Sequence, residues 1–148
     1  MAYTSIEVVN ILYCTIKNSV LMTDVKKPNG SLKKYERPLN SVSEDVVING
    51  LPINRDDVQE CVLNVNIYVP NLQFTKDSPG YLIADKAQPD TARLEYLARL
   101  ANVALGDGEE IWDEEGNYCF KIQQDTIIAD QNNQNYVNMR VEFYASNN

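Results

Sequence analysis

The chain contains no histidine among its 148 residues. Histidine is the usual general base near neutral pH, so its absence excludes Ser-His-Asp triads, Cys-His pairs and histidine-containing zinc sites. Cysteine is also scarce: Cys14, Cys61 and Cys119 are widely spaced and form no Cys-x-x-Cys pair. The sequence therefore predicts reduced, mostly buried thiols in a cytosolic protein that is not an enzyme and has no metal ion and no cofactor.

Basic residues are too few to favour a polyanionic ligand. The chain has 13 Lys and Arg residues against 21 Asp and Glu, a formal net charge of -8. This charge repels a phosphate backbone, so we expect no specific nucleic-acid ligand. Glycine-rich nucleotide motifs are absent as well. No apolar run approaches membrane-spanning length, and no basic region precedes one near the first residues, so we expect neither a signal peptide nor a membrane partner.

The length and composition of the chain predict one globular domain spanning residues 1–148. Hydrophobic residues make up 44% of the chain and charged residues 23%, which is ordinary for a folded protein with a single core.

Two amphipathic helices are predicted. Thr4-Ser5-Ile6-Glu7 has the form of a capping box, and apolar residues follow at spacings of three and four, which predicts a helix over residues 5–21. Asp90 or Thr91 caps a second helix, and Gly106 ends it.

Strand patterns fill much of the rest. A β-branched run covers residues 45–49, and alternating patterns indicate strands at 60–69, near 118–129 and at 137–144. The predicted fold class is α+β, a mainly antiparallel sheet packed against two helices, with a protruding basic hairpin and long loops.

The hairpin is predicted from turn residues. Pro28-Asn29-Gly30 supplies positive φ at Asn29 or Gly30, so residues 26–37 are expected to form a basic hairpin. Residues 70–89 contain three prolines and no sustained period, which predicts a long loop.

Charge concentrates in two places, a basic cluster on this hairpin and an acidic cluster after Gly106. The acidic pairs lie in a loop where desolvation is hard to arrange, which argues against catalysis, and their spacing does not match an EF-hand. Both clusters are either solvated surface or complementary patches that join copies head to tail. The candidate assembly interface is Lys26, Lys27, Lys33, Lys34, Arg37, Phe74, Tyr81, Asp107, Glu109, Glu110, Asp113, Glu114 and Glu115.

Several segments together resemble the tail-terminator and tail-completion (head-tail joining) proteins of tailed phages. They are Ile11-Leu12-Tyr13, the run from Val46 through Pro52, Asn64-Val65-Asn66-Ile67-Tyr68-Val69-Pro70, the second helix and the closing strand. The likeness covers nearly the whole chain. It lies in the order of the predicted helices and strands and in the residue patterns of these segments, and not in a short motif.

The resemblance implies a subunit made in the host cytoplasm that ends in the virion tail or neck. It implies a ring, typically hexameric, that caps the tail tube and meets neck or connector proteins, with the basic hairpin and residues 70–89 as joining elements. The acidic stretch then faces a neighbour or a DNA channel.

Two alternatives are open. One is a small adaptor or inhibitor that binds a host protein through its acidic face. The other is a small enzyme or ligand-binding domain of α+β type with a pocket around Tyr68, Tyr81 and Tyr96.

Overall fold

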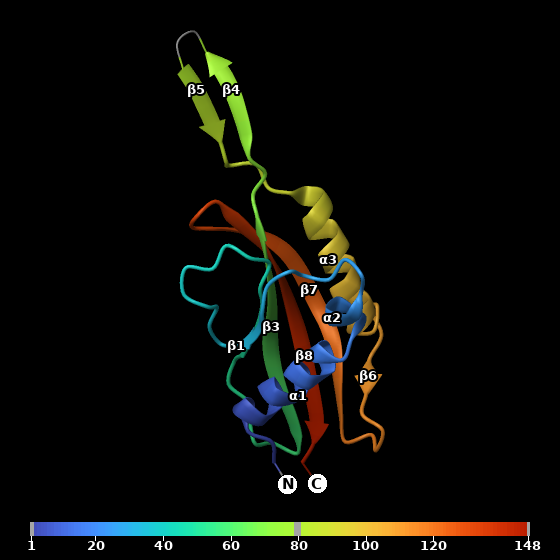
Figure 1. The fold of residues 1–148 in the computed structure, drawn as a ribbon. Coiled ribbons are helices and arrows are strands. Elements are labelled where there is room, and N and C mark those ends of the chain that lie inside the picture. Colours follow the sequence, from blue (N-terminus) through green and yellow to red (C-terminus); the bar gives the residue numbers. More distant parts are fainter. Residues whose placement is uncertain (1, 79–80, 148) are drawn as a thin grey trace.

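Six strands form one sheet in the order β1-β2-β3-β8-β7-β6. Figure 1 shows the computed structural model, which describes residues 2–78 and 81–147, without the side chains of residues 76–78 and 81–83. The strands are β1 (Leu32–Lys34), β2 (Val46–Gly50), β3 (Val58–Pro70), β6 (Ile111–Trp112), β7 (Tyr118–Asp130) and β8 (Gln134–Ser146). The pairing of β1 with β2 is parallel, and every other neighbouring pair is antiparallel.

The long central strands follow from their alternating side chains. Leu63, Val65 and Ile67 of β3 lie opposite Val141, Met139 and Val137 of β8, and all six are buried on one face. The residues between them are polar and half-buried, and on this other face Asn138 Nδ2 donates to Asn64 Oδ1 and Asn66 Oδ1. The predicted strands at 60–69, 118–129 and 137–144 are thus present with longer bounds, and the strand predicted at 45–49 is present one residue further on, as β2.

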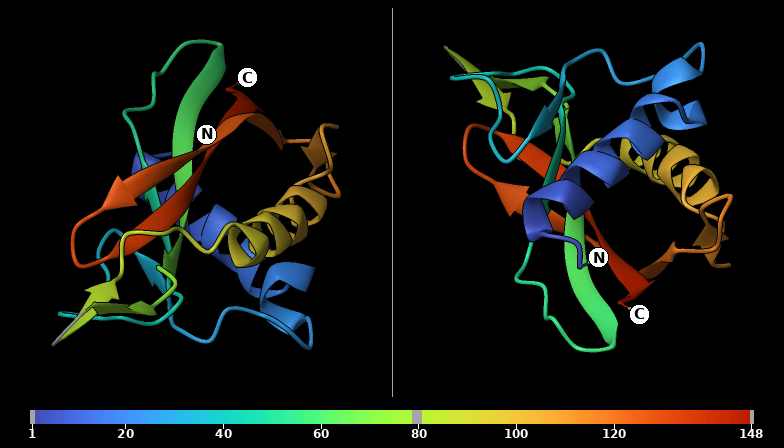
Figure 2. Two further views of the ribbon diagram at one scale, coloured as in Figure 1. Left: turned by 90° about the horizontal axis from the view of Figure 1, so that it is seen from above. Right: turned by 90° about the horizontal axis from the view of Figure 1, so that it is seen from below.

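Of the helices in the described residues, α1 (Ser5–Lys17) and α3 (Thr91–Ala104) lie on the apolar face of the sheet, and the short α2 (Val20–Thr23) packs against both of them (Figure 2). Thr4 caps α1 by accepting a hydrogen bond from the Glu7 N–H, and Asp90 caps α3 by accepting one from the Arg93 N–H. The single helix expected over residues 5–21 is interrupted near Ser19, whose Oγ donates to Ile16 O at 2.6 Å. None of the described helices is both long and apolar enough to cross a membrane.

One cluster of buried side chains joins the helices to the sheet. Leu12 and Ile16 of α1 and Leu94 and Leu97 of α3 are fully buried against the apolar face. Phe120 and Phe143 pack with ring centroids 5.4 Å apart where β7 and β8 run side by side. This burial is the main stabilising contribution to the fold.

The expected fold class, a mainly antiparallel sheet packed against two helices, is wrong. The protein is mostly β: a six-stranded mixed sheet curved into a half-barrel, with three short helices. The sheet is mixed because the short β1 pairs with β2 in the parallel direction, with Lys33 opposite Val47. Sequence patterns missed this pairing because β1 is largely exposed and has no alternation.

The expected basic hairpin over residues 26–37 is also wrong. Neither Asn29 nor Gly30 has positive φ; Tyr35 and Asn40 do, with φ of 70° and 56°. Asn29 exchanges hydrogen bonds with Glu44 instead, and a Cβ on Gly30 would overlap the carboxylate of Asp45. Glycine is required here for close approach and not for a turn.

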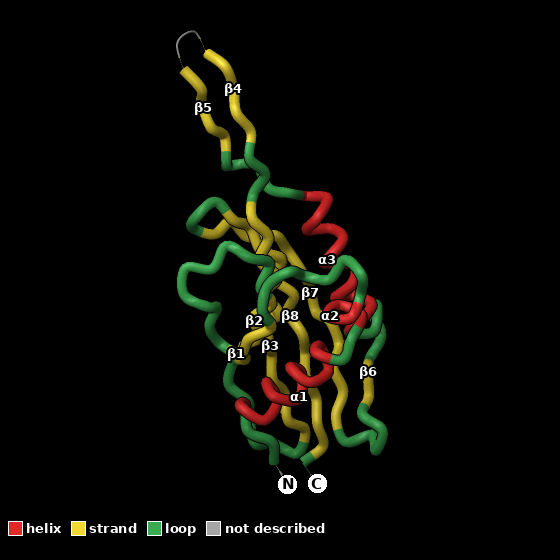
Figure 3. The backbone as a smooth tube through the Cα atoms, viewed as in Figure 1, coloured by secondary structure: helices red, strands yellow, loops and turns green. Residues whose placement is uncertain are grey.

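The protruding hairpin is formed by residues that were expected to be a loop. Strands β4 (Phe74–Ser78) and β5 (Tyr81–Asp85) form a separate two-stranded antiparallel sheet. Figure 3 shows this pair extending away from the rest of the chain, between the end of β3 and the start of α3. We call residues 74–85 the arm.

Candidate assembly interface

Part of the basic cluster and the acidic cluster lie at opposite edges of the sheet. β1, which carries Lys33 and Lys34, is one edge strand, and β6, which lies within the acidic segment, is the other. Both lysines are exposed. A chain with unlike charge on two different edges presents non-identical surfaces, which is the condition for head-to-tail contact between copies.

The basic residues do not form one patch. Lys34 Nζ donates to Asn10 Oδ1 at 2.9 Å and lies 5.1 Å from the Tyr13 ring centroid, beside α1. Lys26 Nζ lies 5.8 Å from the ring centroid of Tyr96, beside α3. Lys27 is exposed next to Lys26 in the chain. The sheet edge therefore retains Lys33 and Lys34, and the other two lysines belong to the helical face.

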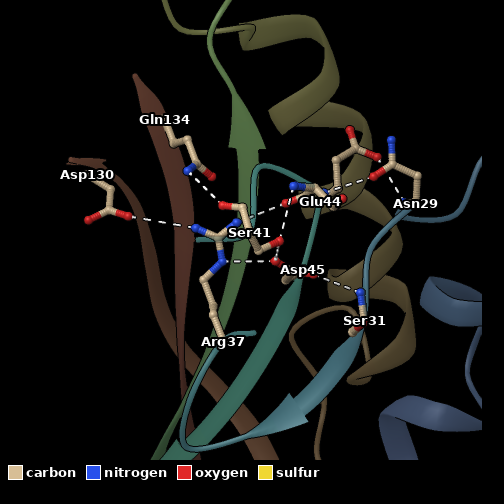
Figure 4. A network of polar contacts seen from close by, with 9 residues as sticks. Asn29, Ser31, Arg37, Ser41, Glu44, Asp45, Asp130 and Gln134 are labelled. Carbon is tan, nitrogen blue, oxygen red and sulfur yellow. Dashed lines mark hydrogen bonds and ion pairs between the residues drawn. The ribbon is translucent and has the colours of Figure 1, made fainter. Parts of the chain in front are cut away.

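Arg37 belongs to a buried polar network and not to the surface cluster. Figure 4 shows its guanidinium group between Asp45 and Asp130, with Nε 3.0 Å from Asp45 Oδ2. Its Cζ also lies 4.1 Å from the centroid of the Tyr68 ring. Because Arg37 is committed to these intramolecular contacts, its expected role in a joining hairpin is not supported by its position.

Asp45 is the centre of that network. Desolvation by burial acts to raise the pKa of its carboxyl group, but hydrogen bonds from the Ser31 N–H, the Ser41 hydroxyl and Arg37 outweigh this, and the net pKa is lowered. The neighbouring Glu44 accepts hydrogen bonds from Arg93 Nε and Nη2 at 2.7 and 2.8 Å. We infer that both carboxylates hold the loop before β2 to the body.

Sequence reasoning did not select Glu44 or Asp45. A usable signal was present, because two adjacent carboxylates immediately precede the β-branched start of a buried strand. Buried carboxylates are normally paired, which would have directed the search to arginines.

The acidic residues are mostly exposed. Glu109, Glu114 and Glu115 project into solvent. Glu110 accepts a hydrogen bond from Trp112 Nε1, and Asp113 accepts one from the Tyr118 N–H, which fixes the turn between β6 and β7. The expected acidic connection thus contains the short strand β6, paired with β7 at Trp112↔Cys119.

Asp107 is less available for an intermolecular contact. Its carboxylate accepts a hydrogen bond from Asn102 Nδ2 and lies 3.9 Å from Arg99 Nη1. Both charged side chains are exposed, so this ion pair contributes little to stability. Two residues of the candidate interface lie on the arm: Phe74 is 51% exposed, and the side chain of Tyr81 lies outside the described residues.

Of the three tyrosines of the alternative pocket, Tyr68 and Tyr96 have described side chains. Tyr68 lies on β3 against Arg37 and Tyr136, whereas the Tyr96 hydroxyl donates to Asp24 beside the helices. Tyr68 and Tyr96 thus contact different partners. Within the described ranges, no three His, Cys, Asp or Glu side chains are grouped as metal ligands.

Several open clefts are present on the described surface, and two of them lie against the long central strands. One, of about 530 Å³, lies by the loop after β2 and contains Glu142, which accepts a hydrogen bond from the Tyr144 hydroxyl. That bond is the main cause that raises the pKa of Tyr144 to about 12. The other, of about 440 Å³, lies between α3 and strands β7 and β8 and is lined by Leu94, Ala98, Ile127, Val137 and Met139 among others.

Comparisons with known proteins assign no family. A scan against protein-family models finds no match, and no curated protein is significantly similar in sequence.

Proposed function

We propose that the chain is a non-enzymatic structural subunit that joins copies of itself head to tail into a ring, as a tail-terminator or tail-completion protein of a phage. The observation that carries the proposal is the position of Lys33 and Lys34 on one edge of the sheet and of the acidic cluster on the other. The likeness in element order to tail-completion proteins supplies the biological setting.

The geometry favours a ring over a two-fold dimer. An isologous dimer pairs the same surface on both copies, which here would place lysine against lysine or glutamate against glutamate. Contact between β1 of one copy and β6 of the next places unlike charges together instead. Such heterologous contacts close into a ring when the rotation between neighbours permits, and a hexamer is the expected size.

In this proposal the ring caps a tail tube and contacts neck or connector proteins. The subunit is made in the host cytoplasm and ends in the virion tail or neck. The arm supports this, because a two-stranded hairpin that extends from its own core is marginally stable alone and gains stability when another protein covers it. The role of the ring is geometric, since the ring ends tube growth and presents a docking surface.

A charge-exchange experiment tests the contact between edges. We expect Lys33→Glu/Lys34→Glu to lose self-association at low salt, because both of its edges are then acidic. We expect Glu109→Lys/Glu110→Lys/Glu114→Lys/Glu115→Lys, which reverses four exposed carboxylates, to lose it as well, because both of its edges are then basic. A 1:1 mixture restores unlike charge at every contact and is expected to form alternating rings, measured by sedimentation velocity and negative-stain microscopy.

The matched control for the lysine variant is Lys17→Glu/Arg55→Glu, which changes the net charge by the same amount at exposed positions outside both clusters. It is expected to assemble as the wild type does. Assembly of either charge variant alone at the wild-type level, or a 1:1 mixture that forms no rings, contradicts the proposed contact. Labelled wild-type protein added to purified tail tubes is expected at one tube end only, and random or absent binding contradicts the tail assignment.

A further inference from the structure

The arm is fixed at its base and unsupported beyond it. The Leu72 N–H donates to Gln88 O and Asn71 Nδ2 donates to Lys86 O, both at 2.9 Å, so the two ends of the arm meet. The Asn71 N–H also donates to Asn133 O, which ties this base to the turn between β7 and β8. Further out, the described residues of β4 and β5 pair with each other only.

A two-stranded hairpin of this size is marginally stable alone in water. Each of its strands has five residues and an outer edge whose backbone groups have no strand partner in the described chain. The arm thus gains stability when a second strand or surface covers it.

The acceptor for such a strand is the outer edge of β7. β6 pairs only with Cys119 and Phe120, so within the described chain the rest of β7 has a strand partner on one side alone. From Gln124 to Asp130 the pairing of β7 with β8 is regular, and residues 123–130 are all exposed.

This open edge lacks two common protections against strand addition. Residues 123–130 include no lysine and no proline, the residues that usually block pairing at an edge. Two adjacent isoleucines, Ile127 and Ile128, are 50% and 37% exposed. Since successive side chains alternate, they place apolar surface on both faces of the edge.

The cleft between α3 and β7 lies along the same strand. Its lining includes Ile127 together with Leu94 and Ala98 of α3. A strand added at the β7 edge directs alternate side chains toward this cleft. Phe74, at the start of β4, is 51% exposed on its own subunit and supplies an aromatic side chain of the kind that an apolar cleft binds.

We propose that the arm of one copy adds as a strand to the open edge of β7 in the next copy, with Phe74 in the cleft beside α3. The proposal rests on the head-to-tail assembly proposed above and names a second contact within it. The five-residue strands fit within the seven residues from Gln124 to Asp130. The acceptor edge is on the same side of the sheet as the acidic β6, so one neighbour contacts both.

Two variants separate the donor from the acceptor. In the first, residues 74–85 are replaced by Asn-Gly, which joins Gln73 to Lys86 across ends that the hydrogen bonds at the base already hold together. In the second, Ile127→Lys/Ile128→Lys places charge on both faces of the open edge. Unchanged urea midpoints and circular dichroism verify that the body of each variant is folded.

The experiment is run at about 1 M salt, where the screening length is about 3 Å and the charged edges contribute little. Wild-type protein is expected to associate, and each variant alone is expected to be monomeric in sedimentation velocity. A 1:1 mixture is expected to form heterodimers and nothing larger, because the only possible contact joins the arm of the second variant to the edge of the first.

Self-association of the arm-deleted variant at the wild-type level overturns the proposal, as does a mixture that stays monomeric. A mixture that is monomeric while the arm binds tail tubes identifies the tube as the occupant, which also overturns it. If the mixture of charge variants forms rings at low salt but the mixture of the arm and edge variants stays monomeric at high salt, head-to-tail assembly stands and only the arm contact is excluded.

A single substitution tests the cleft. Phe74→Ser is expected to weaken association at high salt by about tenfold or more, and Phe74→Leu to retain most of it, because apolar area drives the contact. Val25→Ser is the matched control, since Val25 is 97% exposed and distant in sequence from both elements. Equal affinities for Phe74→Ser and Val25→Ser overturn the assignment of Phe74 to the cleft.

Discussion

Arg37 donates a hydrogen bond from Nε to Oδ2 of Asp45 over 3.0 Å, and the two side chains are only 16% and 1% exposed. The ion pair joins the loop before β2 to the start of that strand. Arg37 Nη2 also donates to Ser43 O, so one guanidinium group holds both ends of the turn. Burying a charged side chain to this extent is destabilising unless its ion-pair and hydrogen-bond partners are present.

Asp45→Asn is therefore expected to destabilise the protein. The variant removes the carboxylate that Arg37 Nε contacts and leaves Asp130, whose Oδ2 lies 4.0 Å from Arg37 Nη1, as the remaining ion-pair partner, at a cost of about 2 kcal/mol in the free energy of unfolding. Urea denaturation followed by circular dichroism measures the change. Glu109→Asn, at an exposed position, is the control and is expected to change stability by less than about 0.5 kcal/mol. Equal midpoints for the two variants would contradict the structural role of Asp45.

The same carboxylate gives a pH dependence with a defined sign. The folded-state pKa of Asp45 is lowered below its ordinary value of 3.8, so the unfolded chain binds the proton more tightly. The contribution of the Asp45 carboxylate to the free energy of unfolding is fully present above its pKa in the unfolded chain. It is lost as the pH falls through its pKa in the folded protein. We expect the stability difference between wild type and Asp45→Asn to be constant from about pH 5 to 7 and to narrow below about pH 4. A stability difference between the two proteins that widens as the pH falls would contradict the lowered folded-state pKa of Asp45.

Gly30→Ala is expected to be destabilising although Gly30 does not have positive φ. A Cβ at this position would overlap Asp45 Oδ1 and the backbone of Glu44, which has little freedom because its carbonyl accepts a hydrogen bond from the Gly30 N–H. We expect a loss of about 1–3 kcal/mol in urea denaturation. Gly108 provides a contrast, since it has φ of 89° but a Cβ added there would meet nothing within 4 Å. Wild-type stability of Gly30→Ala would show that the loop shifts freely.

The three thiols are expected to differ in reactivity. Cys14 is exposed, whereas Cys61 and Cys119 are buried, and burial raises the pKa of both buried thiols. Maleimide labelling of the native protein is expected to modify one thiol per chain, and labelling in urea to modify three. Cys14→Ser is expected to abolish native labelling. Rapid native labelling of that variant would indicate local opening of β3 or β7.

Some local features follow directly from the sequence. Thr4 and Asp90 cap helices because their side chains accept hydrogen bonds from N–H groups three residues on, and the alternation in β3 and β8 requires one apolar face. The acidic residues after Gly106 are mostly exposed, as charge density alone indicates. These are interactions within one segment or between a side chain and water.

The candidate site depends on contacts that no local pattern contains. Arg37 and Asp45 are eight residues apart, yet their pairing requires the turn between them and removes Arg37 from the basic surface. The arm was missed because neither of its strands packs on the core, so no alternating pattern marks them. A detectable signal was Pro79-Gly80 between two runs of five residues.

The sequence by itself determined the helix starts, the two long central strands and the absence of histidine chemistry. Only the tertiary structure decided that β8 lies between β3 and β7, that β1 runs parallel to β2, and that the edges of opposite charge are β1 and β6. Helix caps and side-chain alternation act over a few residues. Strand order depends on which distant backbones exchange hydrogen bonds, and every backbone offers the same donors and acceptors, so the choice falls to packing of the whole core.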